Sequence, residues 1–301
     1  MYACKRALLI LLISSLAFSQ NNYPPNINAD ETVTFKKTIQ TDLNLWIFYP
    51  NNHKKNDKAA SIVFFFGGGW NGGTPAQFLQ QAKYLQQRGM VSILADYRVK
   101  SRNNTQAIYC LKDAKSAIRW VRTNARKIGI DPNRIVASGG SAGGHLAAAT
   151  GTIPIHDEEG ENFKISSVPN AMILFNPGLI LAPIKEFDIS NSWPANRTSN
   201  LKERIGVEPK SFSPYHFVNE NTPPTIIFHG TKDKTIPYES LEFFDLIMKK
   251  FDNKSIVYLY DGEEHDEEHD DDHDGHGHEE GPTVFSNESD EFGLILDFGD
   301  D

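Results

Sequence analysis

The stretch "DPNRIVASGGSAGGHLAAAT", residues 131–150, contains the pattern that decides the fold. It reads in order as a turn, a short apolar strand, a glycine-rich bend and a helix of small residues. Gly139, Ser141 and Gly143 match G-x-S-x-G, which carries a nucleophilic serine when a strand precedes it and a helix follows. An ordinary glycine-rich turn is the alternative interpretation of the motif alone. The strand and the helix around it favour the nucleophile.

Apolar runs and amphipathic stretches alternate on both sides of this bend. Strands are predicted at 61–66, 91–97, 171–176, 225–230 and 255–260, and helices at 77–88, 106–128 and 238–251. This alternation predicts an α/β fold with a mostly parallel sheet and helices on both faces. Residues 32–50 predict two antiparallel strands at one edge of the sheet. Residues 184–218, rich in Pro, Asn and Ser, predict an excursion of the kind that shapes substrate sites.

A second glycine-rich element, "FFFGGGWNGG" at residues 64–73, follows a predicted buried strand. A serine hydrolase needs backbone amides that converge on the developing oxyanion. We expect them from Gly67 and Gly68, together with Ala142 at the start of the helix after the serine. Trp70 either lines the acyl pocket or braces the loop. A phosphate-binding loop is disfavoured, because the Gly-Lys-Ser/Thr ending is absent.

The chain resembles the α/β-hydrolase fold serine esterases related to bacterial carbohydrate esterases and to the hormone-sensitive-lipase group. The resemblance rests on "FFFGGGW", "DYR", the stretch around the bend and "PPTIIFHGTKDKTIPYES". In the first of these, Phe66 stands where the family's H-G-G-G-W loop has histidine. The resemblance implies an α/β-hydrolase catalytic domain over residues 30–265, without cofactor or metal.

The resemblance also implies the other two catalytic residues. Asp233 matches the acid of the family's H-G-x-x-D motif, and His265 ends the G-x-x-H motif after the next strand. The order Ser141, Asp233, His265 is the α/β-hydrolase order. His145, on the helix after the serine, is expected to pack or to hydrogen-bond a loop. His229 is expected to be a structural hydrogen-bonder.

The N-terminus has the features of a secretory signal peptide. Lys5 and Arg6 precede an apolar run at 7–16, and the small residues that follow predict cleavage near Ser19. A membrane anchor is disfavoured, because that run is shorter than the roughly 20 residues that span a bilayer. We therefore expect residues 1–19 to be removed and the protein to be secreted or periplasmic, with no membrane partner afterwards.

The C-terminal residues 266–301 are predicted to be an acidic, histidine-rich and disordered tail. Residues 261–280 hold twelve Asp and Glu and no Lys or Arg, so they account for the formal net charge of -9. The rest of the chain is close to neutral and lacks the basic stripe that a nucleic-acid-binding surface would need, so no nucleic-acid partner is expected. Weak zinc or nickel binding remains an alternative, because five histidines lie there: His265, His269, His273, His276 and His278.

These features lead to one functional hypothesis and two alternatives. We expect a serine esterase that is exported, as its N-terminus indicates. The resemblance implies acyl, above all acetyl, esters of carbohydrates as its substrates, so the substrate is a small molecule or a polysaccharide. The alternatives are a serine peptidase of the same fold and a metal-binding protein with an inactive hydrolase domain.

Overall fold

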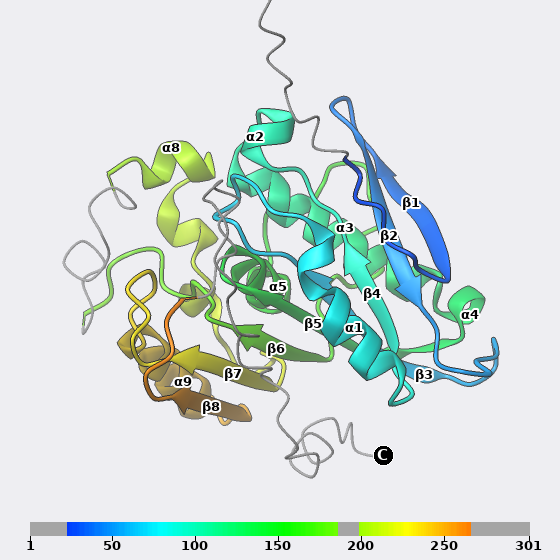
Figure 1. Ribbon diagram of the computed structural model, residues 1–301. Coiled ribbons are helices and arrows are strands. Elements are labelled where there is room, and N and C mark those ends of the chain that lie inside the picture. Colours follow the sequence, from blue (N-terminus) through cyan, green and yellow to red (C-terminus); the bar gives the residue numbers. More distant parts are fainter. Residues whose placement is uncertain (1–22, 186–198, 266–301) are drawn as a thin grey trace, which may run out of the picture.

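The computed structural model describes residues 23–185 and 199–265, which form one sheet with helices packed against it (Figure 1). The strands are β1 (Glu31–Lys37), β2 (Asp42–Phe48), β3 (Ala59–Phe65), β4 (Val91–Ala95), β5 (Ile130–Gly140), β6 (Ala171–Phe175), β7 (Thr225–Gly230) and β8 (Ser255–Tyr260). The α-helices are α1 (Leu79–Gln86), α2 (Lys100–Asn103), α3 (Ala107–Thr123), α4 (Ala125–Ile128), α5 (Ala142–Thr152), α8 (Leu201–Ile205) and α9 (Glu239–Lys250). Three short 3-10 helices are also present, at Pro75–Phe78, Pro209–Phe212 and Pro214–Phe217.

The sheet has the order β1-β2-β4-β3-β5-β6-β7-β8. Strands β1 and β2 pair antiparallel to each other, β2 pairs antiparallel to β4, and the remaining pairs are parallel. The predicted mostly parallel sheet with antiparallel N-terminal strands is therefore confirmed. Parallel strands begin at the same edge of the sheet, so the segments that follow β3, β5, β7 and β8 meet at the opposite edge.

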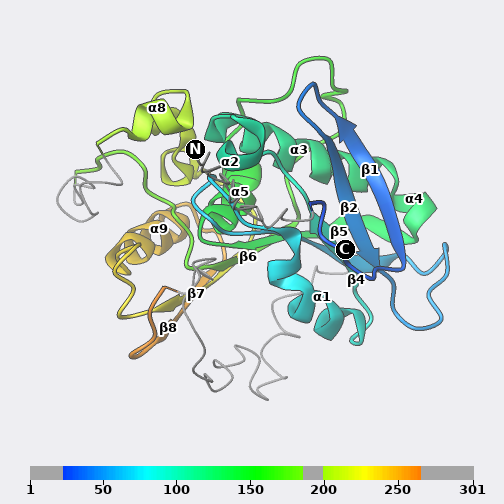
Figure 2. The same ribbon diagram turned by 45° about the horizontal axis from the view of Figure 1, so that its top comes forward.

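Two apolar layers cover the sheet. Side chains of α3, α5 and α9 pack with Val63 and Phe65 of β3 on one face, and side chains of α1 pack with Ile62 and Phe64 on the other. Figure 2 shows α1 apart from α3 and α5 in this way. Because successive residues of β3 enter opposite layers, this strand is apolar at consecutive positions from Ile62 to Phe65 rather than at alternate ones.

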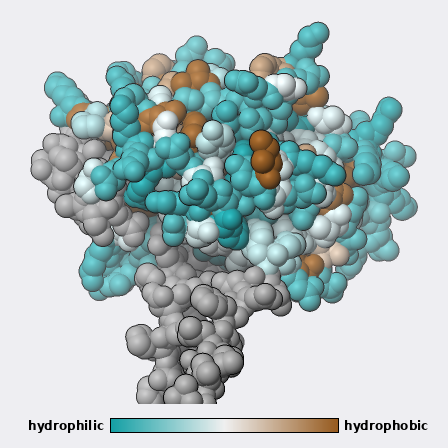
Figure 3. Space-filling view, turned by 90° about the horizontal axis from the view of Figure 1, so that it is seen from above, coloured by the Kyte–Doolittle hydropathy of each residue, from teal (hydrophilic) through white to brown (hydrophobic). Residues whose placement is uncertain are grey.

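The surface of the described residues is mostly hydrophilic in the view from above, where hydrophobic residues form separate spots (Figure 3). Among those residues, no helix combines the length and the apolar character needed to cross a membrane. The predicted signal peptide at 1–19 and the predicted tail at 266–301 lie outside the described residues, so both stay predictions.

Candidate active site

Ser141 occupies the sharp bend between β5 and α5, with φ 50° and ψ -116°. A non-glycine residue at positive φ is strained, and such strain is typical of a serine presented at the edge of a sheet. Two backbone hydrogen bonds hold the bend: Ser141 N donates to Phe175 O at 2.9 Å, and His145 N donates to Ser141 O at 2.9 Å. The fold therefore fixes the serine rather than leaving it on a mobile loop.

The glycines beside this serine are required by space. A Cβ atom at Gly143 would lie 2.0 Å from Phe65 O, and one at Gly139 would lie 2.4 Å from the same oxygen. No side chain fits at these distances, because α5 begins directly against the end of β3. The two glycines of the G-x-S-x-G pattern are therefore needed because α5 lies so close to the neighbouring strand β3.

The structure brings Asp233 and His265 to Ser141. His265 Nε2 lies 3.0 Å from Ser141 Oγ, and His265 Nδ1 lies 2.6 Å from Asp233 Oδ2. Both distances are hydrogen-bond distances. The side chains of Asp233 and His265 are 0% and 4% exposed, so water is largely excluded from the bond between them.

Backbone amides fix the carboxylate that faces His265. Asp233 lies three residues after the end of β7, and its Oδ1 accepts the N–H groups of Thr235 at 2.7 Å and Ile236 at 2.8 Å. Because Oδ1 is occupied in this way, Oδ2 is turned toward His265. A carboxylate held like this can orient an imidazole and stabilise its protonated form.

His229 has a structural role, as expected. Its Nε2 lies 2.9 Å from Ile236 O and 3.4 Å from Asp233 Oδ2, and its ring is buried. Burial lowers the pKa of His229 below its ordinary value. The neutral ring donates to Ile236 O and so stabilises the turn that carries Asp233. The imidazole that is hydrogen-bonded to Ser141 is that of His265, not that of His229.

His145 is also structural and lies under the site. Its Nε2–H donates to Phe212 O at 2.7 Å, and its ring packs edge-on against Trp70 with 5.1 Å between the centroids. The ring is fully buried, and this burial lowers the pKa of His145 to about 4. The expected helix-to-loop hydrogen bond is therefore confirmed.

The buried His145 makes stability depend on pH. Its pKa is about 4 in the folded protein, against roughly 6.5 in the unfolded chain, so between these values the unfolded chain binds the extra proton. The free energy of unfolding should therefore fall by roughly 1–2 kcal/mol when the pH drops from 6.5 to 5. His145→Gln can keep the bond to Phe212 O and should lose that part of the dependence. Urea midpoints at both pH values measure it, and a variant with the full wild-type dependence would contradict this origin.

The glycine loop requires a correction. The N–H of Gly67 donates to Gln77 Oε1 at 2.5 Å, so Gly67 is wrongly predicted as an oxyanion donor in this structure. By contrast, no hydrogen bond in the described part of the chain uses the amide of Gly68 or Gly69. The carbonyl of Gly68 accepts the amides of Asn71 at 2.9 Å and Gly72 at 3.1 Å. Because a trans peptide is planar, the N–H of Gly69 points away from that carbonyl.

A small cavity of about 20 Å³ adjoins Ser141. The residues around it come from five separate segments of the chain: Gly69, Trp70, Ser141, Ala142, His145, Gly178, Arg204 and Ile236. Ala142 begins α5, where the first amides of a helix have no partner within the helix. The cavity therefore has an amide-bearing wall formed by Gly69 and Ala142, and Gly69 is a site residue that the sequence reasoning missed.

Trp70 lines this cavity and also braces the loop, and its place in an acyl pocket stays a prediction. Its ring contacts His145 and Phe212 edge-on, and it is 7% exposed. Arg204 of α8 donates to Gly69 O at 3.2 Å, and its guanidinium lies 5.8 Å from the Trp70 ring. The predicted excursion therefore contributes one helix to the wall of the site.

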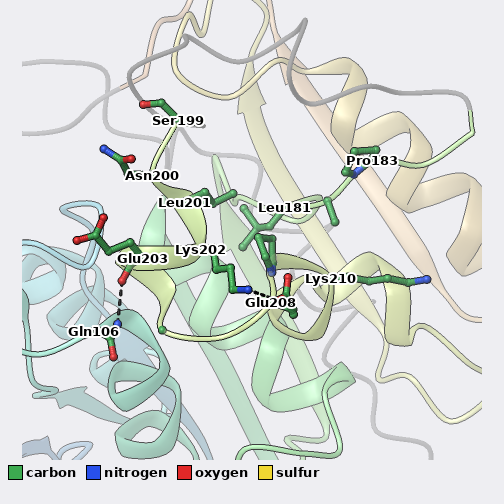
Figure 4. A pocket seen from close by; sticks show the side chains of 13 residues that line it. Gln106, Leu181, Pro183, Ser199, Asn200, Leu201, Lys202, Glu203, Glu208 and Lys210 are labelled. Carbon is green, nitrogen blue, oxygen red and sulfur yellow. Dashed lines mark hydrogen bonds and ion pairs between the residues drawn. The ribbon is translucent and has the colours of Figure 1, made fainter.

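A larger hollow of about 910 Å³ lies on another side of α8 (Figure 4). It is lined mainly by residues 199–210, with Leu181, Pro183 and Gln106 opposite them. None of Ser141, Asp233 and His265 lines it, and Lys202 forms an ion pair with Glu208 across it. The chemistry is therefore assigned to the small cavity, although the other hollow is far larger.

No other site of catalytic type is evident within residues 23–185 and 199–265. In particular, no group of three or more His, Cys, Asp or Glu side chains there is placed to hold a metal ion. The tail histidines beyond His265 lie outside those residues.

Esterases are found among the known proteins to which this chain is similar. The sequence profile of the BD-FAE family matches residues 45–246. Esterase 2 of Thermogutta terrifontis, whose structures include propionate-bound and butyrate-bound forms, is 48% identical to this chain. Its apo form superposes with a TM-score of 0.75 over 81% of this chain and 87% of that one.

Two curated relatives are more distant. A probable isoprenylcysteine alpha-carbonyl methylesterase of Arabidopsis thaliana is 32% identical over 60% of this chain and 40% of its own length. An acetylxylan esterase of Xylanibacter ruminicola is 24% identical over 62% of this chain and 36% of its own length. The match therefore spans less than half of either relative. Each of these proteins is named as an esterase.

Proposed function

Because the chain belongs to the BD-FAE family of α/β-hydrolases, we propose that it is an exported serine esterase that removes short acyl groups, above all acetyl groups, from carbohydrates. One observation carries the proposal: Ser141 Oγ lies 3.0 Å from His265 Nε2, beside a cavity of about 20 Å³. The hydrogen-bonded serine supplies a nucleophile, and the cavity limits the size of the group that it can attack.

In the proposed reaction, Ser141 Oγ attacks the ester carbonyl while His265 Nε2 accepts its proton. Asp233 holds His265 in the tautomer that has its proton on Nδ1, and it stabilises the imidazolium that forms. The oxyanion receives hydrogen bonds from the amides of Ala142, Gly68 and Gly69. His265 then returns the proton to the leaving alcohol, and water hydrolyses the acyl-enzyme by the same route in reverse.

The acyl preference follows from the cavity. A volume of about 20 Å³ holds little more than one water-sized group, which suits the methyl of an acetyl ester. The relative from T. terrifontis has propionate-bound and butyrate-bound structures, which supports short acyl groups as substrates of this chain. A longer chain would have to displace Trp70 or Ile236, which close the cavity.

Two further findings support the carbohydrate and the export parts of the proposal. The acetylxylan esterase among the relatives supports acetylated polysaccharide as substrate. The basic and apolar N-terminus supports export, which gives access to a polymer outside the cell. Release of acetate from acetylated xylan tests the first part. The mass of the exported chain, expected to lack residues 1–19, tests the second.

A panel of p-nitrophenyl esters tests the acyl preference. We expect kcat/KM for octanoate to be at least about 10-fold below that for acetate, because each methylene that does not fit costs ~1–3 kcal/mol. Ile236→Ala should narrow this gap by threefold or more, since it removes a wall of the cavity and keeps the backbone bonds to Asp233 and His229. Ile173→Ala, a matched truncation in β6 on the other core layer, should leave the ratio unchanged. An octanoate rate equal to the acetate rate would refute the small-acyl assignment.

A further inference from the structure

A cluster of buried polar groups lies behind the glycine loop, and the proposed mechanism does not use it. Asp96 follows β4 and is 1% exposed. Its Oδ1 accepts the hydroxyl of Tyr23 and, at 2.8 Å, the amide of Tyr97. The guanidinium of Arg102 lies 3.8 Å from the centre of the Tyr23 ring, and Arg102 Nη2 lies 3.8 Å from Asp96 Oδ1. We call Tyr23, Asp96 and Arg102 the N-terminal clamp.

The clamp reaches the glycine loop through Arg102. Its Nη1 donates to Gly73 O at 2.5 Å, and its guanidinium lies 5.7 Å from the centre of the Phe66 ring. Arg102 Nε and Nη2 are buried and have no hydrogen-bond partner in the described part of the chain. The position of the guanidinium therefore depends on its contact with Tyr23 and its attraction to Asp96.

The loop is packed tightly enough to transmit a movement of Gly73. A Cβ atom at Gly73 would lie 2.2 Å from Gly67 O, and one at Gly68 would lie 2.7 Å from Gly72 O. Backbone in such close contact cannot shift at one end without shifting at the other. A shift of Gly73 would therefore also shift the peptides of Gly68 and Gly69, which carry the proposed oxyanion donors.

Phe66 makes this support necessary. Its ring stacks on Tyr97 with 4.0 Å between the centroids, and the Tyr97 hydroxyl donates to Phe66 O at 2.6 Å. A phenyl ring makes no side-chain hydrogen bond, so the side chain at this end of the loop is held by its contacts with the Tyr97 ring and the Arg102 guanidinium. Arg102 supplies a charge-assisted hydrogen bond to the loop at its other end.

We propose that Tyr23 is a positioning residue of this enzyme: it fixes Arg102 against Gly73 and thereby sets the amides of the glycine loop at Ser141. The inference rests on the proposed function for the role of those amides. Tyr23 lies four positions after Ser19, the predicted cleavage point, so the first residues of the processed chain would complete the active site. Loss of this segment would then lower turnover without touching any residue that contacts the substrate.

Full-length Tyr23→Ala and Tyr23→Phe test the proposal with p-nitrophenyl acetate. We expect Tyr23→Ala to lower kcat by about 10-fold with KM within about twofold, which is less than the roughly 100-fold loss from removing an oxyanion donor. Tyr23→Phe keeps the ring under Arg102 and should lose about threefold. The matched control is Ile27→Ala, which removes a side chain of the same segment that is 8% exposed and packs in the core. It should lower the urea midpoint and leave kcat unchanged.

Hydrogen–deuterium exchange of peptides covering residues 66–78 supplies a readout that needs no turnover. Exchange there should be faster in Tyr23→Ala than in wild type, and unchanged in Ile27→Ala. The proposal is overturned if exchange in Tyr23→Ala equals that of wild type, or if kcat of an active enzyme stays the same. A wild-type protein without turnover on any ester would instead refute the proposed function, and the exchange data would still decide whether Tyr23 holds the loop.

Discussion

Ser141→Ala is expected to lower kcat for p-nitrophenyl acetate by at least about four powers of ten, the loss typical of removing a triad nucleophile. The folded state should be almost unaffected. The variant keeps Cβ, so the strained backbone at φ 50° is no worse than with serine, and the hydroxyl, which lies 3.0 Å from His265 Nε2, is small. We expect a change below ~1 kcal/mol in the free energy of unfolding, measured by urea denaturation at pH 7.5.

Ser138→Ala is the matched control for this experiment. Ser138 lies on β5, three residues before Ser141, is fully buried, and its hydroxyl has no hydrogen-bond partner among the described residues. Its removal should leave kcat unchanged. If Ser141→Ala retained more than a tenth of wild-type turnover, or if Ser138→Ala lost as much, the nucleophile would have to be sought elsewhere.

The fold could be predicted because its signals are local. Strands β3 and β4 are apolar at all positions except Ser61 and Ser92 because they are covered on both faces, and such runs differ visibly from amphipathic helices such as α3. The signal of the nucleophile bend is also local, because the motif residues Gly139, Ser141 and Gly143 lie within five positions of the chain. The two glycines are required because the bend packs closely against the neighbouring strand β3.

The donors of the glycine loop could not be assigned in the same way. Which amides face the serine depends on how the loop turns, and that is set by Gln77, which captures the amide of Gly67 from ten residues away. The glycine pattern "GGGWNGG" shows only that the backbone is free to turn. Gln77 belongs to the 3-10 helix Pro75–Phe78, which follows the loop directly. A helix of four residues is too short to show a periodic pattern, so its position could not be recognised from the sequence.

The walls of the cavity and the N-terminal clamp depend on still longer contacts. Arg204 comes from α8, which has five residues and is too short to show an amphipathic period. Tyr23 meets Asp96 across 73 residues of sequence, and nothing in the polar segment around Tyr23 distinguishes it from a loop. Such features are visible only when the sheet has brought distant segments together.

His265→Ala is expected to lower kcat by at least about four powers of ten, since Ser141 would lose the base within hydrogen-bond reach. Proton transfer needs the imidazole at about 3 Å, and His265 meets this requirement because it follows β8 and is anchored by Asp233 at 2.6 Å. No other histidine among the described residues can take its place, since the buried rings nearest the site donate to backbone carbonyls, His145 to Phe212 and His229 to Ile236.

The decisive comparison is with a variant in which the remaining tail histidines are changed together to glutamine. These are His269, His273, His276 and His278, which lie outside the described residues. If His265 alone is the base, this fourfold variant should keep kcat within about threefold, and EDTA should have no effect, because a Ser/His/Asp mechanism uses no metal. Equal losses in both variants, or activity of the fourfold variant restored by added zinc, would instead make the tail a metal site and remove His265 from the triad. Because the two variants differ in whether the histidine held by Asp233 is kept, a large loss confined to His265→Ala would assign the proton transfer to that residue.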